Sequence, residues 1–233
     1  PVVDYQKIQD CIFLGELSLN GDVKKVNGIL PILISARSLG YKKFFIPYAN
    51  INEASFIDKI EIYAVKTLKQ TVNYFNGTEI IEPVKPKSFE EMALEQTPNA
   101  LDMKYVKGQK FAKRALEIAA AGGHNIMMIG PPGSGKTLLA KCFPSILPDL
   151  TFEEALEVTK IHSIAGELDD SKGIVFKRPF RTPHHTATII ALAGGNKNCR
   201  PGEVSLAHNG VLFLDEFPEY KRDFIEVLRQ PLE

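Results

Sequence analysis

One eight-residue string constrains this chain more than any other feature of its sequence. Residues 130–137 read GPPGSGKT, which matches the pattern G-x-x-x-x-G-K-[ST] at every position. The glycines of such a loop let the backbone turn so that its N–H groups point inward around phosphate oxygens. Lys136 then places a positive charge on the β- and γ-phosphates, and Thr137 offers a hydroxyl to Mg²⁺. The predicted nucleotide contacts are Gly130, Pro131, Pro132, Gly133, Ser134, Gly135, Lys136, Thr137 and Leu138.

The sequence on both sides of the loop has the pattern that a phosphate site requires. NIMMI before it predicts a short apolar strand, and LLAKCF after it predicts a helix whose N-terminus faces the phosphates. A glycine-rich surface loop without a ligand is the alternative, and a chance match is expected in roughly 1% of chains of this length. The motif and its context together favour a site for ATP and Mg²⁺.

A second string, GVLFLDE at residues 210–216, predicts a buried strand that ends in two carboxylates. Open α/β sheets bind their ligands at the carboxyl ends of the strands. Asp215 would hold Mg²⁺ or its water, and Glu216 would orient and polarise the attacking water. An ordinary strand that ends in solvated acids would look the same, so the preceding loop is what favours the functional interpretation. We predict Lys136, Asp215 and Glu216 as catalytic residues, and Thr137 and Asp215 as metal ligands.

The spacing of apolar residues and prolines divides the chain into three parts. Residues 1–77 predict a two-residue hairpin turn at Asn20-Gly21 and then alternating helices and strands, a small α+β domain. Residues 78–100 carry three prolines and predict a linker with one short helix. Residues 101–233 alternate helices with apolar strands, which predicts an α/β domain with a parallel sheet and helices on both faces.

Individual elements can be predicted from periodicity and capping residues. A capping box at Thr151 and Glu154 starts one helix, and Thr67 is the predicted N-cap of another. Predicted helices cover ILPILISARSL, NEASFID, TLKQTVNYF, GQKFAKRALEIAAA, TFEEALEVTK and KRDFIEVLRQ, and predicted strands cover KKFFIPY, EIYAV, NIMMIG and GVLFLDE.

Composition narrows the class of protein only slightly. Lys and Arg number 28, as do Asp and Glu, so the formal net charge is zero and requires no polyanion or membrane partner. The three cysteines, Cys11, Cys142 and Cys199, form no CxxC pair, which predicts neither a disulfide framework nor a thiolate zinc site and fits a reducing cytoplasm. No apolar run reaches the roughly 18 residues of a transmembrane helix, and the first residues have no signal-peptide pattern.

Two further groups of residues are weaker candidates. His184 and His185, with Cys199, His162 and His208, could hold a metal, but their spacing matches no zinc pattern and a structural polar motif is favoured. The polar loop GGNKNCRPG carries Lys197 and Arg200, which are suited to DNA phosphates, although a solvated loop would look the same. Arg178 and Arg181 are similar candidates with less support.

Three strings resemble the magnesium-chelatase-like AAA+ ATPases, most closely the ComM/YifB group. They are VKGQKFAKRALEIAAAGGHNIMMIGPPGSGKT, RPFRTPHHTATIIALAGG and RPGEVSLAHNGVLFLDEFPEY. The resemblance implies ATP hydrolysis between the subunits of a homo-oligomeric ring, a hexamer. It also implies that Val106 and Gly108 lie beside the adenine, and that residues 187–206 form an insert toward the central pore.

The N-terminal string FLGELSLNGDVKKVNGILPILISARSLGYKKFFIP resembles the Lon-protease-like domain that begins ComM proteins. The catalytic lysine of Lon proteases has no counterpart at residues 27–32, and the segment that carries their serine is absent, so we expect no proteolysis. By resemblance the chain starts partway through this domain, and the sensors, the arginine finger and the helical lid lie outside it. An arginine finger contributes about 10³–10⁵ in rate, so we expect this chain alone to bind nucleotide with little turnover.

The resemblance implies a DNA motor for branch migration and recombination in natural transformation. Three alternatives stay open: a chelatase-type motor that remodels a partner enzyme, a nucleotide-dependent scaffold, and an ATP-dependent protease. The Lon-like unit favours the DNA motor over the chelatase. The complete set of Lys136, Thr137, Asp215 and Glu216 argues against a scaffold, and the missing lysine argues against a protease.

Overall fold

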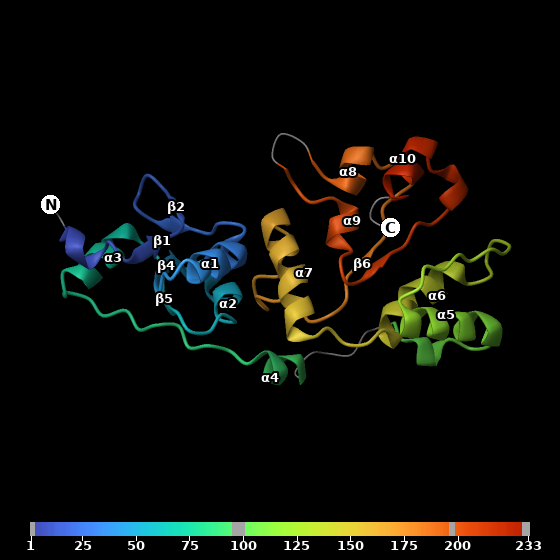
Figure 1. Cartoon of the computed structure of the whole chain (residues 1–233), viewed down its shortest axis with the longest axis horizontal. Coiled ribbons are helices and arrows are strands. Elements are labelled where there is room, and N and C mark those ends of the chain that lie inside the picture. The colour runs from blue at the N-terminus through green and yellow to red at the C-terminus, as the bar shows by residue number, and fades with distance from the viewer. Residues whose placement is uncertain (1–2, 95–100, 196–198, 230–233) are drawn as a thin grey trace. The chain divides into compact units, whose positions relative to one another are not determined.

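A computed structural model of the chain describes residues 3–94, 101–195 and 199–229 (Figure 1). Their contacts define two compact units. The first comprises residues 1–95 and 159–175, and the second comprises residues 96–158 and 176–233. The first unit thus includes a segment that follows the phosphate-binding loop in the sequence, and the sequence pattern gave no sign of this. The predicted functional domains, 1–77 and 101–233, stay a prediction.

The first unit is built on a three-stranded parallel sheet in the order β1–β4–β5. The central strand β4 pairs over its whole length with β5, and its Phe44, Phe45 and Ile46 are almost completely buried. An unbroken apolar run is what a strand covered on both faces requires. The elements of this unit are η1 Tyr5–Lys7, β1 Cys11–Phe13, β2 Glu16–Leu17, β3 Val23–Lys24, α1 Ile29–Ser38, β4 Lys43–Pro47, η2 Tyr48–Asn50, α2 Ile51–Ala54, β5 Glu61–Val65, α3 Leu68–Phe75 and α4 Phe89–Leu94.

Helix α3 covers one face of this sheet and begins where the sequence predicts. The Thr67 hydroxyl accepts a hydrogen bond from the Gln70 amide at 3.1 Å, which caps the helix. Two aromatic residues at its end pack against the sheet in a cluster whose ring centroids lie 5.0–5.9 Å apart. The cluster consists of Phe13, Phe45, Tyr63, Tyr74 and Phe75. Aromatic contacts of this kind add to the burial that holds α3 in place.

The predicted hairpin forms, but its turn is longer than predicted. β2 and β3 pair antiparallel with Leu17 opposite Val23, so residues 18–22 form the loop in place of a two-residue turn. Polar side chains explain the difference. Ser18 Oγ accepts from the amide of Asp22 at 3.1 Å, and Asn20 donates to the Asp22 carboxylate at 2.6 Å. These bonds close the wider loop, as side chain to backbone bonds often do in turns.

A buried polar network joins the segment 159–175 to the rest of the first unit. Glu53, which is 5% exposed, accepts hydrogen bonds from the Leu30 amide at 3.0 Å and from the Ser163 hydroxyl. The Ser163 hydroxyl in turn accepts from the Gly28 amide at 2.9 Å, and Asn50 donates to the other Glu53 oxygen at 3.3 Å. Because buried polar groups are costly without partners, this network fixes the start of α1 against residues 159–175.

Replacing Glu53 by alanine is expected to lower the free energy of unfolding by about 2–4 kcal/mol, because it leaves the buried Leu30 amide and Ser163 hydroxyl without their acceptor. Urea unfolding of the wild type and the variant measures the change. Glu82→Ala, which removes an exposed carboxylate of the same unit, is the matched control and should change stability little. An equal, small effect of both substitutions would show that the network does not hold the unit together.

Two apolar clusters among the described residues hold helices of the second unit together. The first joins Met103, Leu116, Leu139 and Cys142, and so holds α5 and α6 together. The second joins Leu192, Tyr220, Phe224 and Leu228, and so holds α8 against α10. The elements are η3 Met103–Tyr105, α5 Lys110–Gly122, α6 Lys136–Cys142, η4 Phe143–Ile146, β6 Phe180–Arg181, α8 Ile189–Ala193, α9 Glu203–Leu206, β7 Val211–Leu212, η5 Phe217–Glu219 and α10 Arg222–Val227, while α7 Phe152–Ala165 contains the boundary between the units.

The capping box predicted for α7 is present. The Thr151 hydroxyl accepts from the Glu154 amide at 3.2 Å, and the Glu154 carboxylate accepts from the Thr151 amide at 3.1 Å. Each bond satisfies a backbone donor that the first turn of a helix leaves without a partner.

The predicted parallel sheet of the second unit is much smaller than expected. In the described part of this unit, β6 and β7 pair in parallel, Phe180 opposite Val211 and Arg181 opposite Leu212. Prolines limit this pair, because Pro179 precedes β6 and Pro183 follows it closely. The chain is a mixed α/β protein with parallel strand pairs and helices, as predicted.

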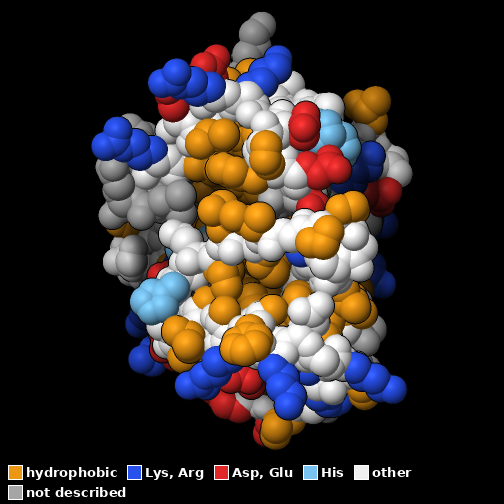
Figure 2. Space-filling model, turned by 90° about the vertical axis from the view of Figure 1, so that its right-hand side faces the viewer, with side chains coloured by type: hydrophobic (Ala, Val, Ile, Leu, Met, Phe, Trp, Pro, Cys, Tyr) orange, Lys and Arg blue, Asp and Glu red, His pale blue; other side chains and the backbone are white. Residues whose placement is uncertain are grey.

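The prediction of a strand at NIMMIG is wrong for this structure. Residues 124–130 have no strand partner among the described residues, and Met127 and Ile129 are 73% and 87% exposed. A strand forms only where another strand takes up its backbone hydrogen bonds, so an apolar run alone does not make one. Figure 2 shows hydrophobic side chains gathered on the face that it views. No helix of the described residues has the length and apolar character to cross a membrane.

Candidate nucleotide-binding site

The phosphate-binding loop lies between residues 124–130 and helix α6. Gly133 and Gly135 have φ angles of +75° and +89°, which residues with a Cβ rarely adopt. A Cβ at either position would meet no atom within 4 Å, so the backbone angle, not lack of space, requires glycine there. Gly135 is the N-cap of α6, and the amides of the first helical turn have no partner within the helix. The loop therefore has the backbone geometry that the motif predicts.

The Lys136 side chain folds back over its own loop. Its Nζ donates to the carbonyl oxygens of Gly130 at 2.7 Å and Pro131 at 2.9 Å. These bonds hold the ammonium group above the loop, where anionic phosphate oxygens could replace the carbonyls as acceptors. Pro131, Pro132, Thr137 and Leu138 are exposed, so the outer side of the loop is open to solvent.

Thr137 and Asp215 meet, as the two motifs predict. The Thr137 hydroxyl donates to Asp215 Oδ2 at 3.1 Å, although the two residues are 78 positions apart in the sequence. A hydroxyl and a carboxylate are oxygen ligands of the kind that Mg²⁺ prefers. Asp215 also accepts from the Glu216 amide through Oδ1 at 3.0 Å. The residues present fit a bound Mg²⁺, which Thr137 and Asp215 would hold.

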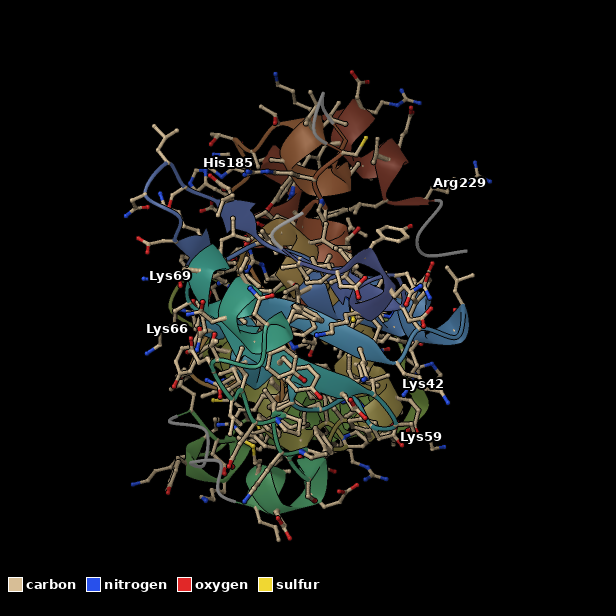
Figure 3. All side chains as sticks on the ribbon, turned by 90° about the vertical axis from the view of Figure 1, so that its left-hand side faces the viewer. Lys42, Lys59, Lys66, Lys69, His185 and Arg229 are labelled. Atoms are coloured by element: carbon tan, nitrogen blue, oxygen red, sulfur yellow. The ribbon has the colours of Figure 1, made fainter. Side chains whose placement is uncertain are left out.

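Glu216 does not point the same way as Asp215, which the sequence pattern did not predict. Its backbone is left-handed, with φ 53° and ψ 45°, because the chain turns after β7. Its Oε2 lies 3.3 Å from Nδ1 of His185, which is labelled in Figure 3. The two carboxylates thus face different partners.

The sequence analysis missed one residue that contacts the loop. Gln109 donates from Nε2 to the carbonyl oxygen of Ser134 at 3.1 Å. It lies in the predicted adenine-side stretch, where Gly108 and Gln109 both have positive φ angles. Val106, by contrast, packs beside the cluster that contains Leu116. The roles of Val106 and Gly108 beside an adenine stay a prediction.

The other candidate residues separate into paired and exposed groups. Arg178 donates to the Glu154 carboxylate at 2.9 Å, and Arg181 binds both carboxylate oxygens of Glu203 at 2.7 and 2.8 Å. Arg200 is exposed, and Lys197 lies outside the described residues. Over residues 3–94, 101–195 and 199–229, no three His, Cys, Asp or Glu side chains gather as a metal site.

Residues 130–137 have the sequence of a P-loop, and the Asp215 carboxylate lies beside them. Comparison with known proteins places the chain in a family. A family model described as magnesium chelatase, subunit ChlI, matches residues 102–233, and one described as subunit ChlI of Mg-chelatase matches residues 2–50. The chain belongs to the magnesium-chelatase-like family of ATPases, in the group that includes ComM and YifB.

Three relatives show how far the similarity extends. The competence protein ComM of Haemophilus influenzae is 41% identical over 233 residues, which cover 99% of this chain and 45% of that protein. The uncharacterized protein YifB of Escherichia coli is 40% identical over 227 residues, 97% of this chain and 44% of that protein. Lon protease 2 of Bacillus subtilis is 45% identical over 60 residues, 25% of this chain and 11% of that protein. The chain spans less than half the length of ComM and YifB.

Proposed function

We propose that this chain forms the nucleotide-binding part of an enzyme that hydrolyses ATP to ADP and phosphate with Mg²⁺. The observation that carries the proposal is the 3.1 Å contact between the Thr137 hydroxyl and the Asp215 carboxylate. It joins the phosphate-binding loop to the acidic segment after β7, so the predicted metal ligands lie together. Neither a surface loop nor a solvated strand end requires this contact.

Each residue of the site has a definite part in this proposal. Lys136 moves its ammonium group from the loop carbonyls to the phosphate oxygens, and the amides of the loop donate to the same phosphates. Thr137 and Asp215 hold Mg²⁺, which when bound neutralises charge on the phosphate oxygens. Glu216 orients the attacking water and takes up its proton. The loop and Lys136 thus bind the phosphates of ATP, whereas Glu216 acts on the attacking water.

The intact protein is proposed to be a DNA motor for branch migration and recombination that works as a homo-oligomeric ring. Two observations support this. The relative ComM is named a competence protein, and exposed Arg200 lies in a loop that is closed at its base by the bridge between Gly194 and Pro201. Exposed basic side chains on such a loop suit a nucleic-acid backbone. Arg178 and Arg181 are engaged inside the unit and are not proposed to contact DNA.

The first unit is proposed to be a Lon-like domain without protease activity. Residues 27–32, which read NGILPI, contain no lysine, and the helix α1 that they begin is apolar at its buried positions. The buried carboxylate in this unit, Glu53, is used for the hydrogen bonds that fix α1. These features favour a structural or regulatory role over proteolysis.

The test is the ATPase rate of the full-length protein with and without branched DNA, beside its Lys136→Ala variant. We expect a rate that DNA raises at least several-fold and that the variant loses. A robust rate that is indifferent to DNA would instead favour a chelatase-type or protein-remodelling motor, the function that the magnesium chelatase family model favours. No hydrolysis under any condition would contradict the proposed activity.

A further inference from the structure

The HH pair of the sequence lies beside the acidic segment, where the proposed activity assigns it no part. His185 Nδ1 lies 3.3 Å from Glu216 Oε2. The distance is that of an ion pair and is slightly longer than an ordinary N–H···O hydrogen bond, and catalytic hydrogen bonds are often long before substrate binds. The His185 side chain is 30% exposed and that of Glu216 is 66% exposed, so the carboxylate has few other neighbours to hold it.

The loop that carries His185 is anchored through the carbonyl group of Pro183. Pro183 accepts a hydrogen bond through its carbonyl oxygen from the buried Tyr220 hydroxyl at 2.7 Å. Burial, and then the negative charges of Asp215 and Glu216, raise the pKa of Tyr220, so its hydroxyl keeps the proton that it donates. Within the loop, the centroid of the His184 ring lies 4.1 Å from that of the His185 ring, and His184 Nδ1 lies 2.9 Å from the Thr186 hydroxyl. These contacts restrict where the His185 imidazole can go.

The backbone of Glu216 turns its side chain toward that imidazole. A left-handed conformation is uncommon for a residue with a Cβ, and such conformations persist mainly where the surroundings fix them, often at functional sites. The Glu216 amide donates to Asp215 Oδ1, while Asp215 Oδ2 accepts from Thr137. The turn therefore directs Asp215 to the metal side of the site and Glu216 to His185.

We propose that His185 is a positioning residue that holds the Glu216 carboxylate in the orientation for hydrolysis, through the contact between Nδ1 and Oε2. The inference rests on the proposed ATPase function, in which Glu216 orients the attacking water. A long exposed side chain otherwise samples several rotamers, and fixing a reacting group in the productive geometry raises the rate. His185 does not touch the nucleotide in this proposal, so it affects turnover and not ATP binding.

The experiment compares His185 variants of the full-length protein for ATP hydrolysis and, separately, for the Kd of a non-hydrolysable ATP analogue. His185→Ala is expected to lower kcat on the order of tenfold, less than loss of the base itself, and to leave Kd and KM within about twofold. His185→Asn places an amide N–H near the position of Nδ1 and should restore most of the rate, whereas His185→Gln, whose amide lies near Nε2, should not. The Asn and Gln pair keeps the test valid even if His185→Ala fails to fold.

Two further measurements separate positioning from a structural effect. In a Glu216→Gln background, His185→Ala should cause little additional loss, because residues that act as a unit are not additive. His208→Ala is the matched control, since His208 Nε2 lies 3.2 Å from Glu157 Oε2 in the same unit without contacting Glu216. An unchanged kcat in His185→Ala, equal rates in the Asn and Gln variants, or a full tenfold loss in the Glu216→Gln background would overturn the proposal.

The outcomes also separate this inference from the function on which it rests. If the wild type hydrolyses ATP and His185→Ala has the same kcat, the role of His185 is rejected and the proposed ATPase activity is retained. A wild type that binds the analogue but hydrolyses no ATP would reject the ATPase itself, and the role of His185 with it.

Discussion

Replacing Lys136 by alanine is expected to weaken ATP binding by at least about 100-fold while leaving the fold intact. Charge-assisted hydrogen bonds contribute about 1.5–3 kcal/mol each. Losing the contacts to two phosphates should therefore raise the Kd for ATP about 100-fold or more. The fold should survive, because the Lys136 side chain bonds to the carbonyls of its own loop, at Gly130 and Pro131, and is only half-buried. Titration with a fluorescent ATP analogue measures the affinity.

Lys141→Ala is the control for this substitution. Lys141 lies on the same helix α6, is exposed, and is five positions further from the loop. It tests whether losing any positive charge from this helix weakens ATP binding, and we expect a Kd close to that of the wild type. Thermal unfolding of both variants should differ little from the wild type. A Lys136→Ala variant that binds ATP as the wild type does would remove the phosphate site from residues 130–137.

The helices and most strands of the first unit could be predicted because their signals are local. Thr67 caps α3, the apolar run at residues 44–47 makes most of β4, and Gly40 follows the end of α1. The addition of residues 159–175 to this unit could not be predicted. It depends on hydrogen bonds between residues more than 100 positions apart, such as Ser163 with Glu53, and no local pattern marks such pairs.

The strand at NIMMIG shows the limit of a hydrophobic pattern. The run is apolar enough for a buried strand, yet neither β6 nor β7 pairs with it in this structure. Whether an apolar run becomes a strand depends on a partner elsewhere in the chain, so the pattern of one segment cannot decide it. The helix α6 forms where predicted, because a helix makes its backbone hydrogen bonds within its own segment.

The site residues could be predicted where they belong to contiguous sequence motifs. The contact of Thr137 with Asp215 follows from two strings with known roles. The contacts of Gln109 with Ser134 and of His185 with Glu216 depend instead on backbone turns with positive φ at non-glycine residues. The sequence has no reliable signal for such turns, because any residue type except glycine is uncommon there. The HH string indicated a possible metal site and gave no sign of a contact with Glu216.

Replacing Glu216 by glutamine is expected to leave ATP binding intact and to lower the rate of hydrolysis by about 10²–10⁴, the usual contribution of a general base. Glutamine has nearly the same shape and keeps a carbonyl oxygen that can accept from His185, but it cannot take a proton from water. The full-length variant should therefore retain bound ATP that it does not hydrolyse. Single-turnover hydrolysis of radiolabelled ATP, followed beside a filter-binding assay, measures both properties.

Glu219→Gln provides the matched comparison, because Glu219 is an exposed carboxylate in η5, three residues further along the same turn. It should hydrolyse ATP at the wild-type rate. Lys136→Ala and Glu216→Gln then separate the two parts of the site, since the first loses binding and the second loses only turnover. Normal turnover in Glu216→Gln would remove this carboxylate from the reaction and leave Asp215, which faces Thr137, as the one acid of the motif with a part in it.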